Sequence, residues 1–227
     1  MSPYRRSTLR PLAIMYGFNR GSPLRSDFAR MKLHTRFLKS AAAPEHFPPP
    51  LAPEVAFLGR SNVGKSSLIN ALLGEKIAHV SSTPGRTRTI NFIELRQKAD
   101  TVQPDLVLAD LPGYGYARIS KEISAEWPKF IEPYLSDREP LRLCVCLVDS
   151  NVPPQKSDQR LIGWLQHHDR DLLVVATKAD RLSSNQLNKA LAQLRREHQV
   201  ERILPVSAKT GMGLAELWQQ IRKATEH

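Results

Sequence analysis

The sequence predicts an α/β fold, with a six-stranded, mostly parallel sheet, one antiparallel edge strand and helices on both faces. Two observations support this prediction. From Glu54 onward, short apolar segments alternate with longer helix-like segments, which is the pattern of repeated strand–helix units. Most of the apolar segments are hydrophobic throughout, as expected of parallel strands that helices cover on both faces.

A strand–helix pair and a hairpin open this domain. Residues 54–59 form a short apolar run that predicts a strand, and residues 64–74 predict a helix that ends at Gly74, a residue suited to the position after a helix. Residues 87–95 alternate apolar and polar side chains, and residues 106–113 are largely apolar. The polar stretch between them predicts an antiparallel hairpin.

Helices and strands then alternate to the end of the sequence. Strand 141–149 holds Cys144 and Cys146, which are expected in the core on one face of the sheet, because side chains alternate along a strand. Two cysteines give neither a disulfide framework nor a zinc spacing, which suits a reducing compartment. No run of eighteen apolar residues predicts a membrane span. The other expected elements are helix 119–139, interrupted by two prolines, helix 155–168, strand 171–178, helix 183–199, strand 201–208 and helix 214–226.

Residues 1–52 are expected to be a flexible, basic, proline-containing extension, and residues 53–227 the folded domain. Residues 1–45 carry nine Lys or Arg and two acidic residues, which is +7 of the total +11. Such an arm favours a polyanionic partner, with RNA as the first candidate. Three other interpretations stay open: a solvated tail, a transit peptide in residues 1–30 that would direct the protein to an organelle, and translation that begins at Met31.

A phosphate-binding loop is predicted at residues 59–66, GRSNVGKS. The spacing G-x-x-x-x-G-K-S stands between a predicted strand and a predicted helix, which is the context that this motif requires. Gly59 and Gly64 permit a close approach of the backbone, and the amides at the helix N-terminus are expected to face the β-phosphate. Lys65 is expected to reach the β- and γ-phosphates, and the Ser66 hydroxyl to bind Mg²⁺.

Two further motifs complete a nucleotide site. VLADLPGYG places Asp110 at the end of a strand and Gly113 at D-x-x-G spacing, where they are expected to hold the Mg²⁺ water shell and to sense the γ-phosphate. TKAD, residues 177–180, follows another buried strand. The Asp180 carboxylate can accept hydrogen bonds from N1 and N2 of guanine, whereas adenine offers no such donors. Lys178 is expected to lie along the base and bridge back to the phosphate loop, and the amides of residues 207–209 to meet the guanine carbonyl.

The motifs GRSNVGKS, TPGRT, DLPGYGYA, TKAD and SAK together resemble Ras-like GTPases of the translation-factor class, and more narrowly the EngB family, also called YihA or YsxC. The resemblance covers about residues 36–223. It implies a cytoplasmic, monomeric GTPase that assists assembly of the large ribosomal subunit, through contacts with ribosomal RNA and proteins of its precursor, and that is needed for normal septation in cell division. It also implies that Thr87 closes on Mg²⁺ when the γ-phosphate is present.

These interpretations define one candidate site. Lys65, Thr87 and Gly113 are expected to serve catalysis, and Ser66, Thr87 and Asp110 to hold Mg²⁺, Asp110 through water. The residues expected to contact GTP or GDP are Gly59, Arg60, Ser61, Asn62, Val63, Gly64, Lys65, Ser66, Ser67, Gly85, Arg86, Thr87, Arg88, Thr89, Asp110, Leu111, Pro112, Gly113, Thr177, Lys178, Ala179, Asp180, Val206, Ser207 and Ala208.

Two positions bear on the mechanism. Many small GTPases carry a water-orienting glutamine after D-x-x-G, whereas this chain has Tyr114, so intrinsic hydrolysis is expected to be slow. Asn62 either holds a K⁺ ion beside the phosphates, as in related GTPases, or serves loop geometry. Two alternative functions stay open: a nucleotide-gated module that binds RNA or the ribosome with negligible turnover, and a division protein that acts at the septum. The TKAD motif opposes an enzyme that uses ATP.

Overall fold

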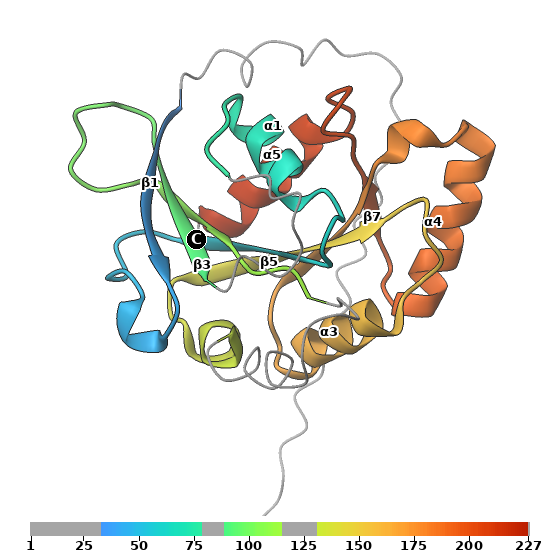
Figure 1. The fold of residues 1–227 in the computed structure, drawn as a ribbon, viewed down its shortest axis with the longest axis horizontal. Helices are drawn as coiled ribbons and strands as arrows, with labels where there is room; N and C mark the ends of the chain where they lie inside the picture. Colours follow the sequence, from blue (N-terminus) through green and yellow to red (C-terminus); the bar gives the residue numbers. More distant parts are fainter. Residues whose placement is uncertain (1–32, 79–88, 115–130, 227) are drawn as a thin grey trace, which may run out of the picture. The chain divides into compact units, whose positions relative to one another are not determined.

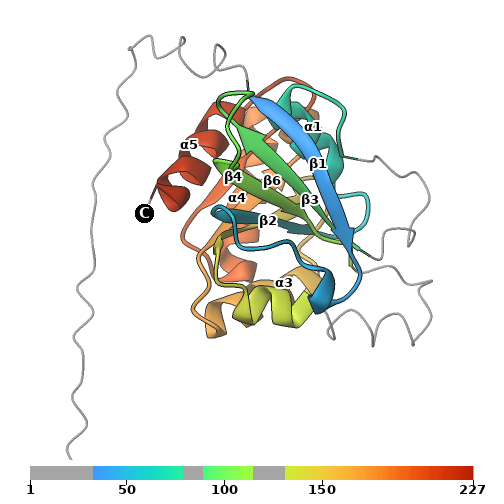
Figure 2. The same ribbon diagram turned by 90° about the vertical axis from the view of Figure 1, so that its left-hand side faces the viewer.

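The computed structural model describes residues 33–78, 89–114 and 131–226. Within these residues, one sheet has the strand order β1-β3-β4-β2-β5-β6-β7; Figure 1 and Figure 2 together label its strands. Neighbours from β4 to β7 pair in parallel, whereas β3 is antiparallel to both of its neighbours. The α/β fold predicted from the sequence is therefore confirmed. The strands are β1 (His34–Ala41), β2 (Glu54–Gly59), β3 (Ile90–Arg96), β4 (Leu106–Asp110), β5 (Leu141–Asp149), β6 (Leu172–Thr177) and β7 (Ile203–Pro205).

Helices cover both faces of the sheet (Figure 2). On one face, α1 (Lys65–Leu73) and α5 (Leu214–Thr225) pack on a buried apolar cluster. On the other, α3 (Lys156–His167), α4 (Ser184–His198) and the helix at residues 131–137 bury a second cluster. Helix α1 ends where the sequence predicts, because Gly74 adopts the left-handed conformation after it, with φ 71°. No described helix has the length and apolar character needed to cross a membrane.

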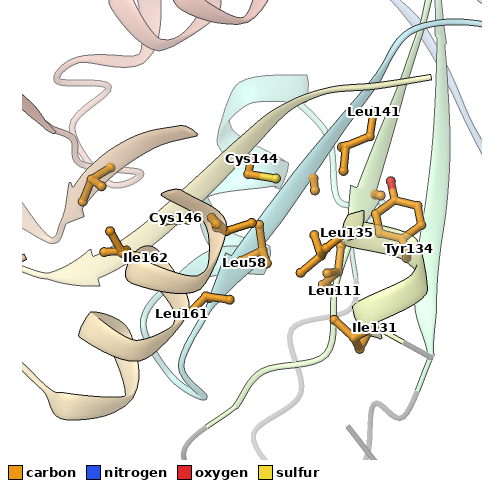
Figure 3. Close-up of a cluster of buried hydrophobic side chains, with 14 of the residues drawn as sticks. Leu58, Leu111, Ile131, Tyr134, Leu135, Leu141, Cys144, Cys146, Leu161 and Ile162 are labelled. Carbon is orange, nitrogen blue, oxygen red and sulfur yellow. The ribbon is translucent and has the colours of Figure 1, made fainter. Parts of the chain in front are cut away.

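Alternation along the central strands divides the core between these two faces. In β2, Val55 and Phe57 point into the cluster of α1 and α5, whereas Ala56 and Leu58 point into the other. Cys144 and Cys146 of β5 lie together in the cluster beneath α3 (Figure 3), as expected, and both thiols are free. Burial raises the pKa of Cys144 to about 12, so its thiol stays protonated and acts as a packing group.

The expected boundary at residue 52 and the expected strand number are wrong. Residues 34–41 form β1, whose register with β3 runs from His34 opposite Arg96 to Ala41 opposite Ile90. The sheet therefore has seven strands within the described residues. Strand β1 is the edge strand and pairs with β3, which is an interior strand. Residues 1–32 lie outside the described residues, so the function of the basic arm stays a prediction.

The proline-rich segment between β1 and β2 is packed on the domain. The Phe47 ring meets Tyr134 edge-on at 5.4 Å between centroids. Arg138 donates to the Pro48 carbonyl at 2.8 Å and forms an ion pair with Glu54. The hydroxyl of Tyr134 also donates to Glu54, at 2.8 Å. The contacts of Phe47 and Pro48 therefore hold the segment on the domain, in contrast to the flexible linker that its prolines predict.

A buried histidine at the end of α4 gives a first testable prediction. His198 is 3% exposed, and neither ring nitrogen has a hydrogen-bond partner within the described part of the chain. Burial lowers its pKa. Below about pH 6.5 the histidine of the unfolded state therefore binds a proton more readily than His198 of the folded state. The free energy of unfolding consequently decreases as the pH falls.

His198→Leu should stabilise the protein by about 1–3 kcal/mol, because it removes unsatisfied buried polar atoms. The gain should be larger at about pH 5.5 than at about pH 8. Urea unfolding at both values measures it, with the exposed His167→Gln as the matched control. An equal gain at the two pH values would show that the ring does not titrate on unfolding.

Candidate functional site

The phosphate loop runs from β2 into α1, and both of its glycines are required by geometry. Gly64 has φ 102°, a conformation that residues with a side chain rarely adopt. At Gly59 the restriction is space: an added Cβ would lie 2.7 Å from Val63 Cγ1. Helix α1 begins at Lys65, so its first amides face the loop, as an anion site at a helix N-terminus requires.

Two groups of opposite charge meet beside this loop. Asp110 ends β4 and pairs in register with Phe57 of β2. The Lys65 ammonium forms an ion pair with the Asp110 carboxylate, and the two side chains are only 10% and 5% exposed. The residues predicted to serve the phosphate and the metal are therefore in direct contact.

The donor set here fits Mg²⁺. The Ser66 hydroxyl, in the first turn of α1, and the Asp110 carboxylate are hard oxygen ligands. The described residues contain no group of three or more His, Cys, Asp or Glu that could enclose a metal. Mg²⁺ that is shared with phosphate groups needs only one or two protein ligands. Thr87, the third expected ligand, lies outside the described residues.

The D-x-x-G segment is attached directly to the phosphate loop. Ser61 N donates to the Tyr114 carbonyl at 3.1 Å, and Tyr114 N donates to the Gly59 carbonyl at 3.3 Å. A Cβ on Gly113 would lie 3.1 Å from both the backbone nitrogen and the hydroxyl of Ser61. A side chain here would crowd Ser61, so glycine suits this close approach, and the segment that is expected to sense the γ-phosphate lies directly against the loop that is expected to hold it.

The TKAD segment, residues 177–180, also forms hydrogen bonds with the phosphate loop. The Thr177 hydroxyl donates to the Val63 carbonyl at 2.6 Å. The Lys178 ammonium donates to the Asn62 carbonyl at 2.8 Å and forms an ion pair with Asp149 at 2.6 Å. The bridge from Lys178 to the phosphate loop, expected from the sequence, is present in the structure.

Residues 206–208 complete this side of the site. Ala179 N donates to the Val206 carbonyl at 3.1 Å, which joins the two segments. The buried Ser207 hydroxyl hydrogen-bonds Asp180 and thereby lowers the pKa of this carboxyl. Asp180 is therefore ionised at neutral pH and able to accept hydrogen bonds from N–H donors. A cavity of about 380 Å³, within the size range of small-molecule sites, is lined by residues that include Gly64, Thr177, Asp180 and Ala208.

The remaining expected residues divide into three groups. Gly85, Arg86, Thr87 and Arg88 lie outside the described residues. Thr89 precedes β3, and its hydroxyl donates to Asn91 at 3.3 Å, a contact within the hairpin. Of the others, Ser67 lies in the first turn of α1 and lines the cavity of about 380 Å³, and three lie at the ends of β2 and β4: Arg60, Leu111 and Pro112.

Loop geometry accounts for Asn62 without an ion. Asn62 has φ 65°, and asparagine tolerates this left-handed conformation better than most residues with a side chain. Its carbonyl accepts the hydrogen bond from Lys178. The role of K⁺ stays a prediction.

Two aspartates near the site are not predicted by the sequence motifs. Asp149 ends β5 opposite Thr177. Burial acts to raise its pKa, but hydrogen bonds from Lys178 and Asn151 outweigh burial and lower it. Its sequence signal is an Asp at the end of a buried parallel strand, the same signal that identifies Asp110. The other is Asp158, which is 4% exposed in the first turn of α3 and accepts a hydrogen bond from the Tyr114 hydroxyl. Only its place at a helix start is visible in the sequence.

Comparison with known proteins assigns the sequence to one family. Residues 54–178 match the family described as 50S ribosome-binding GTPase. The chain is 62% identical over 193 residues to a probable GTP-binding protein EngB of Acidobacterium capsulatum, covering 85% of this chain and 92% of that protein. It is 58% identical over 194 residues to the protein of the same description from Koribacter versatilis, covering 86% and 95%.

Solved structures share the fold. The crystal structure of a probable GTP-binding protein engB matches with a TM-score of 0.62 and 24% identity, covering 76% of this chain and 98% of that one. Era in complex with MgGDPNP and nucleotides 1506–1542 of 16S ribosomal RNA matches with a TM-score of 0.62 and 24% identity, covering 76% and 56%. At this identity the two likenesses concern the fold alone.

Proposed function

Because this chain belongs to the EngB family of GTP-binding proteins and hydrolyses GTP, we propose that its GTP cycle is a Mg²⁺-dependent switch in the assembly of the large ribosomal subunit. The partner in this proposal is the subunit precursor, with its RNA and proteins, and the protein acts as a cytoplasmic monomer. Normal cell division and septation then depend on it indirectly, through the supply of ribosomes.

One observation carries the proposal at the site: the hydrogen-bonded junction between Gly59, Ser61 and Tyr114. It ties the D-x-x-G segment to the phosphate loop, so a phosphate group bound by the loop meets the Gly113 amide. The presence or absence of the γ-phosphate then changes what the segment contacts, which is the requirement for a switch.

In this proposal the site residues act on the phosphates, the base and the metal. The loop amides and Lys65 bind the β- and γ-phosphates, and Asp180 fixes the guanine. Ser66 and Asp110 would hold Mg²⁺, which neutralises charge on the phosphate oxygens when bound. The chain has no glutamine after Gly113 to orient the attacking water, so a slow intrinsic step is expected in the absence of the ribosomal partner.

The ribosomal partner is supported by the family description, 50S ribosome-binding GTPase, and by charge. The chain carries a net charge of +11, which favours association with a polyanion. In this proposal the basic residues 1–32 add RNA contacts of their own.

Hydrolysis assays with ribosomal particles separate the switch from a nucleotide-gated binding module. We expect slow GTP hydrolysis by the full chain alone and a clear acceleration by large subunits or their precursors. Small subunits at the same concentration are the control, because they offer RNA without the expected partner. The module interpretation would be favoured if large subunits bind the GTP form and hydrolysis stays negligible. An equal effect of the two subunits would contradict the proposed partner.

A further inference from the structure

The side chain of Tyr114 is directed toward helix α3. Its hydroxyl donates to Asp158 in the first turn of that helix, and its ring packs against the buried cluster that contains Cys146. Tyr114 does not line the cavity between Gly64 and Asp180. The residue that stands in the place of a water-orienting glutamine is thus held by a second element of the domain.

The same residue is also part of the phosphate-loop junction. Its backbone forms a parallel bridge with Arg60, in addition to its hydrogen bonds with Gly59 and Ser61. Tyr114 is therefore fixed at both ends, by the loop at its backbone and by Asp158 at its hydroxyl. Release of the hydroxyl would remove the polar contact between Tyr114, the residue next to Gly113, and helix α3.

We propose that Asp158 is a positioning residue for GTP hydrolysis, which through the Tyr114 hydroxyl keeps Gly113 in register with the phosphate loop. The inference rests on the GTPase activity of the family and adds a residue outside its sequence motifs. Asp158 does not touch the nucleotide in this account. It acts by fixing the amide that meets the γ-phosphate, and it thereby favours GTP over GDP.

The environment of Asp158 makes this contact sensitive to pH. Three charged or titratable groups face Asp158: Arg60 of the phosphate loop, Tyr114 after β4, and Cys146 of β5. The Ser157 hydroxyl also donates to Asp158, at 3.5 Å. Burial raises the pKa of Asp158 to about 6, although Tyr114, Arg60 and Ser157 act to lower it.

Asp158 is therefore ionised at neutral pH and protonated below about pH 6. A hydrogen bond to a carboxylate is roughly twice as strong as one between neutral groups. The contact is consequently strong above this pH and weakens as the pH falls. Asp149 and Lys178, which line the adjacent cavity of about 220 Å³ together with Asp158, form their own ion pair.

A double-mutant cycle tests the inference. Tyr114→Phe removes the donor, Asp158→Asn removes the charge of the acceptor, and the double variant removes both. Each should lower kcat for GTP hydrolysis by about ten- to a hundredfold, since a misplacement on the order of 1 Å can cost about a hundredfold. The double variant should be no slower than the slower single variant. Asp171→Asn, an exposed carboxylate between α3 and β6, is the control.

Two further readouts exclude a purely structural effect. The ratio of the affinities for a non-hydrolysable GTP analogue and for GDP should shift toward GDP in each variant, and this ratio needs no turnover. It therefore tests the inference even if the ribosomal proposal fails. The kcat of the wild type should rise through about pH 6, and Asp158→Asn should lack this component. Additive effects in the cycle, an unchanged affinity ratio, or losses of kcat that only follow losses of thermal stability would each overturn the inference.

Discussion

Asp180→Asn should lower the affinity for GTP by about 10²–10⁴-fold, because two hydrogen bonds to a charged group are lost at about 1.5–3 kcal/mol each. The carboxylate accepts from two N–H groups of guanine, whereas an amide presents its own N–H to one of them. Xanthine carries a carbonyl at that position, so the variant should bind xanthosine nucleotides. Fluorescence titration with guanosine and xanthosine diphosphates measures both changes.

The fold should not contribute to this result, because the Asp180 side chain lies at the cavity and outside the core. The matched control is again Asp171→Asn, which makes the same chemical change at an exposed position. Retained GTP affinity without any gain for xanthosine nucleotides would mean that the base lies elsewhere.

Lys65→Ala should weaken GTP binding by about 10²–10⁴-fold, because contacts with two charged phosphate groups are lost at about 1.5–3 kcal/mol each. The structure adds a second consequence. Asp110 is 5% exposed and pairs with Lys65, so the variant leaves a buried carboxylate alone. Removing one partner of a buried ion pair destabilises by about 3–5 kcal/mol.

A double variant separates the two effects. Lys65→Ala with Asp110→Asn should recover most of the lost thermal stability and still bind GTP poorly. Lys189→Ala, on the exposed face of α4, is the control for loss of a lysine. Calorimetry and nucleotide titration give the two quantities independently. A folded single variant that binds GTP normally would exclude Lys65 from phosphate binding.

The phosphate loop and the order of strands and helices could be predicted because their signals are local. Gly59 and Gly64 are fixed by a steric limit and by a positive φ, and both constraints act within eight residues of sequence. The apolar strands carry no polar alternation because helices cover both sides of them. The contact from Lys178 to the loop follows from the same logic, since parallel strands bring their carboxyl ends together.

Strand β1 was not predicted, because its sequence pattern is weak and the strand that it pairs with is distant in the sequence. It pairs with β3, with Arg36 opposite Glu94, 58 positions along the chain. A register shift between Phe37 and Lys39 interrupts its alternation, and Phe37 is 45% exposed at the edge of the sheet. A proline-rich segment follows it. Neither periodicity nor composition distinguishes such a strand from an extended tail.

Asp158 shows the same limit at the site. Its role depends on a contact with Tyr114, 44 positions earlier, that only the packing of α3 on the sheet creates. In the sequence it is one acidic residue in the first turn of a helix, a common and generally electrostatic preference. The motifs therefore identify the groups that touch the nucleotide, and the fold identifies the group that holds one of those motifs in position.

Cosedimentation of the full chain with large ribosomal subunits tests the central claim most directly. The protein should pellet with the subunits in the presence of a non-hydrolysable GTP analogue and remain in the supernatant with GDP. Asp180→Asn should make the same binding depend on a xanthosine triphosphate analogue instead, which would assign the effect to this nucleotide site. Equal binding with both guanine nucleotides, or binding that ignores the base in the variant, would contradict a GTP-controlled switch on the large subunit.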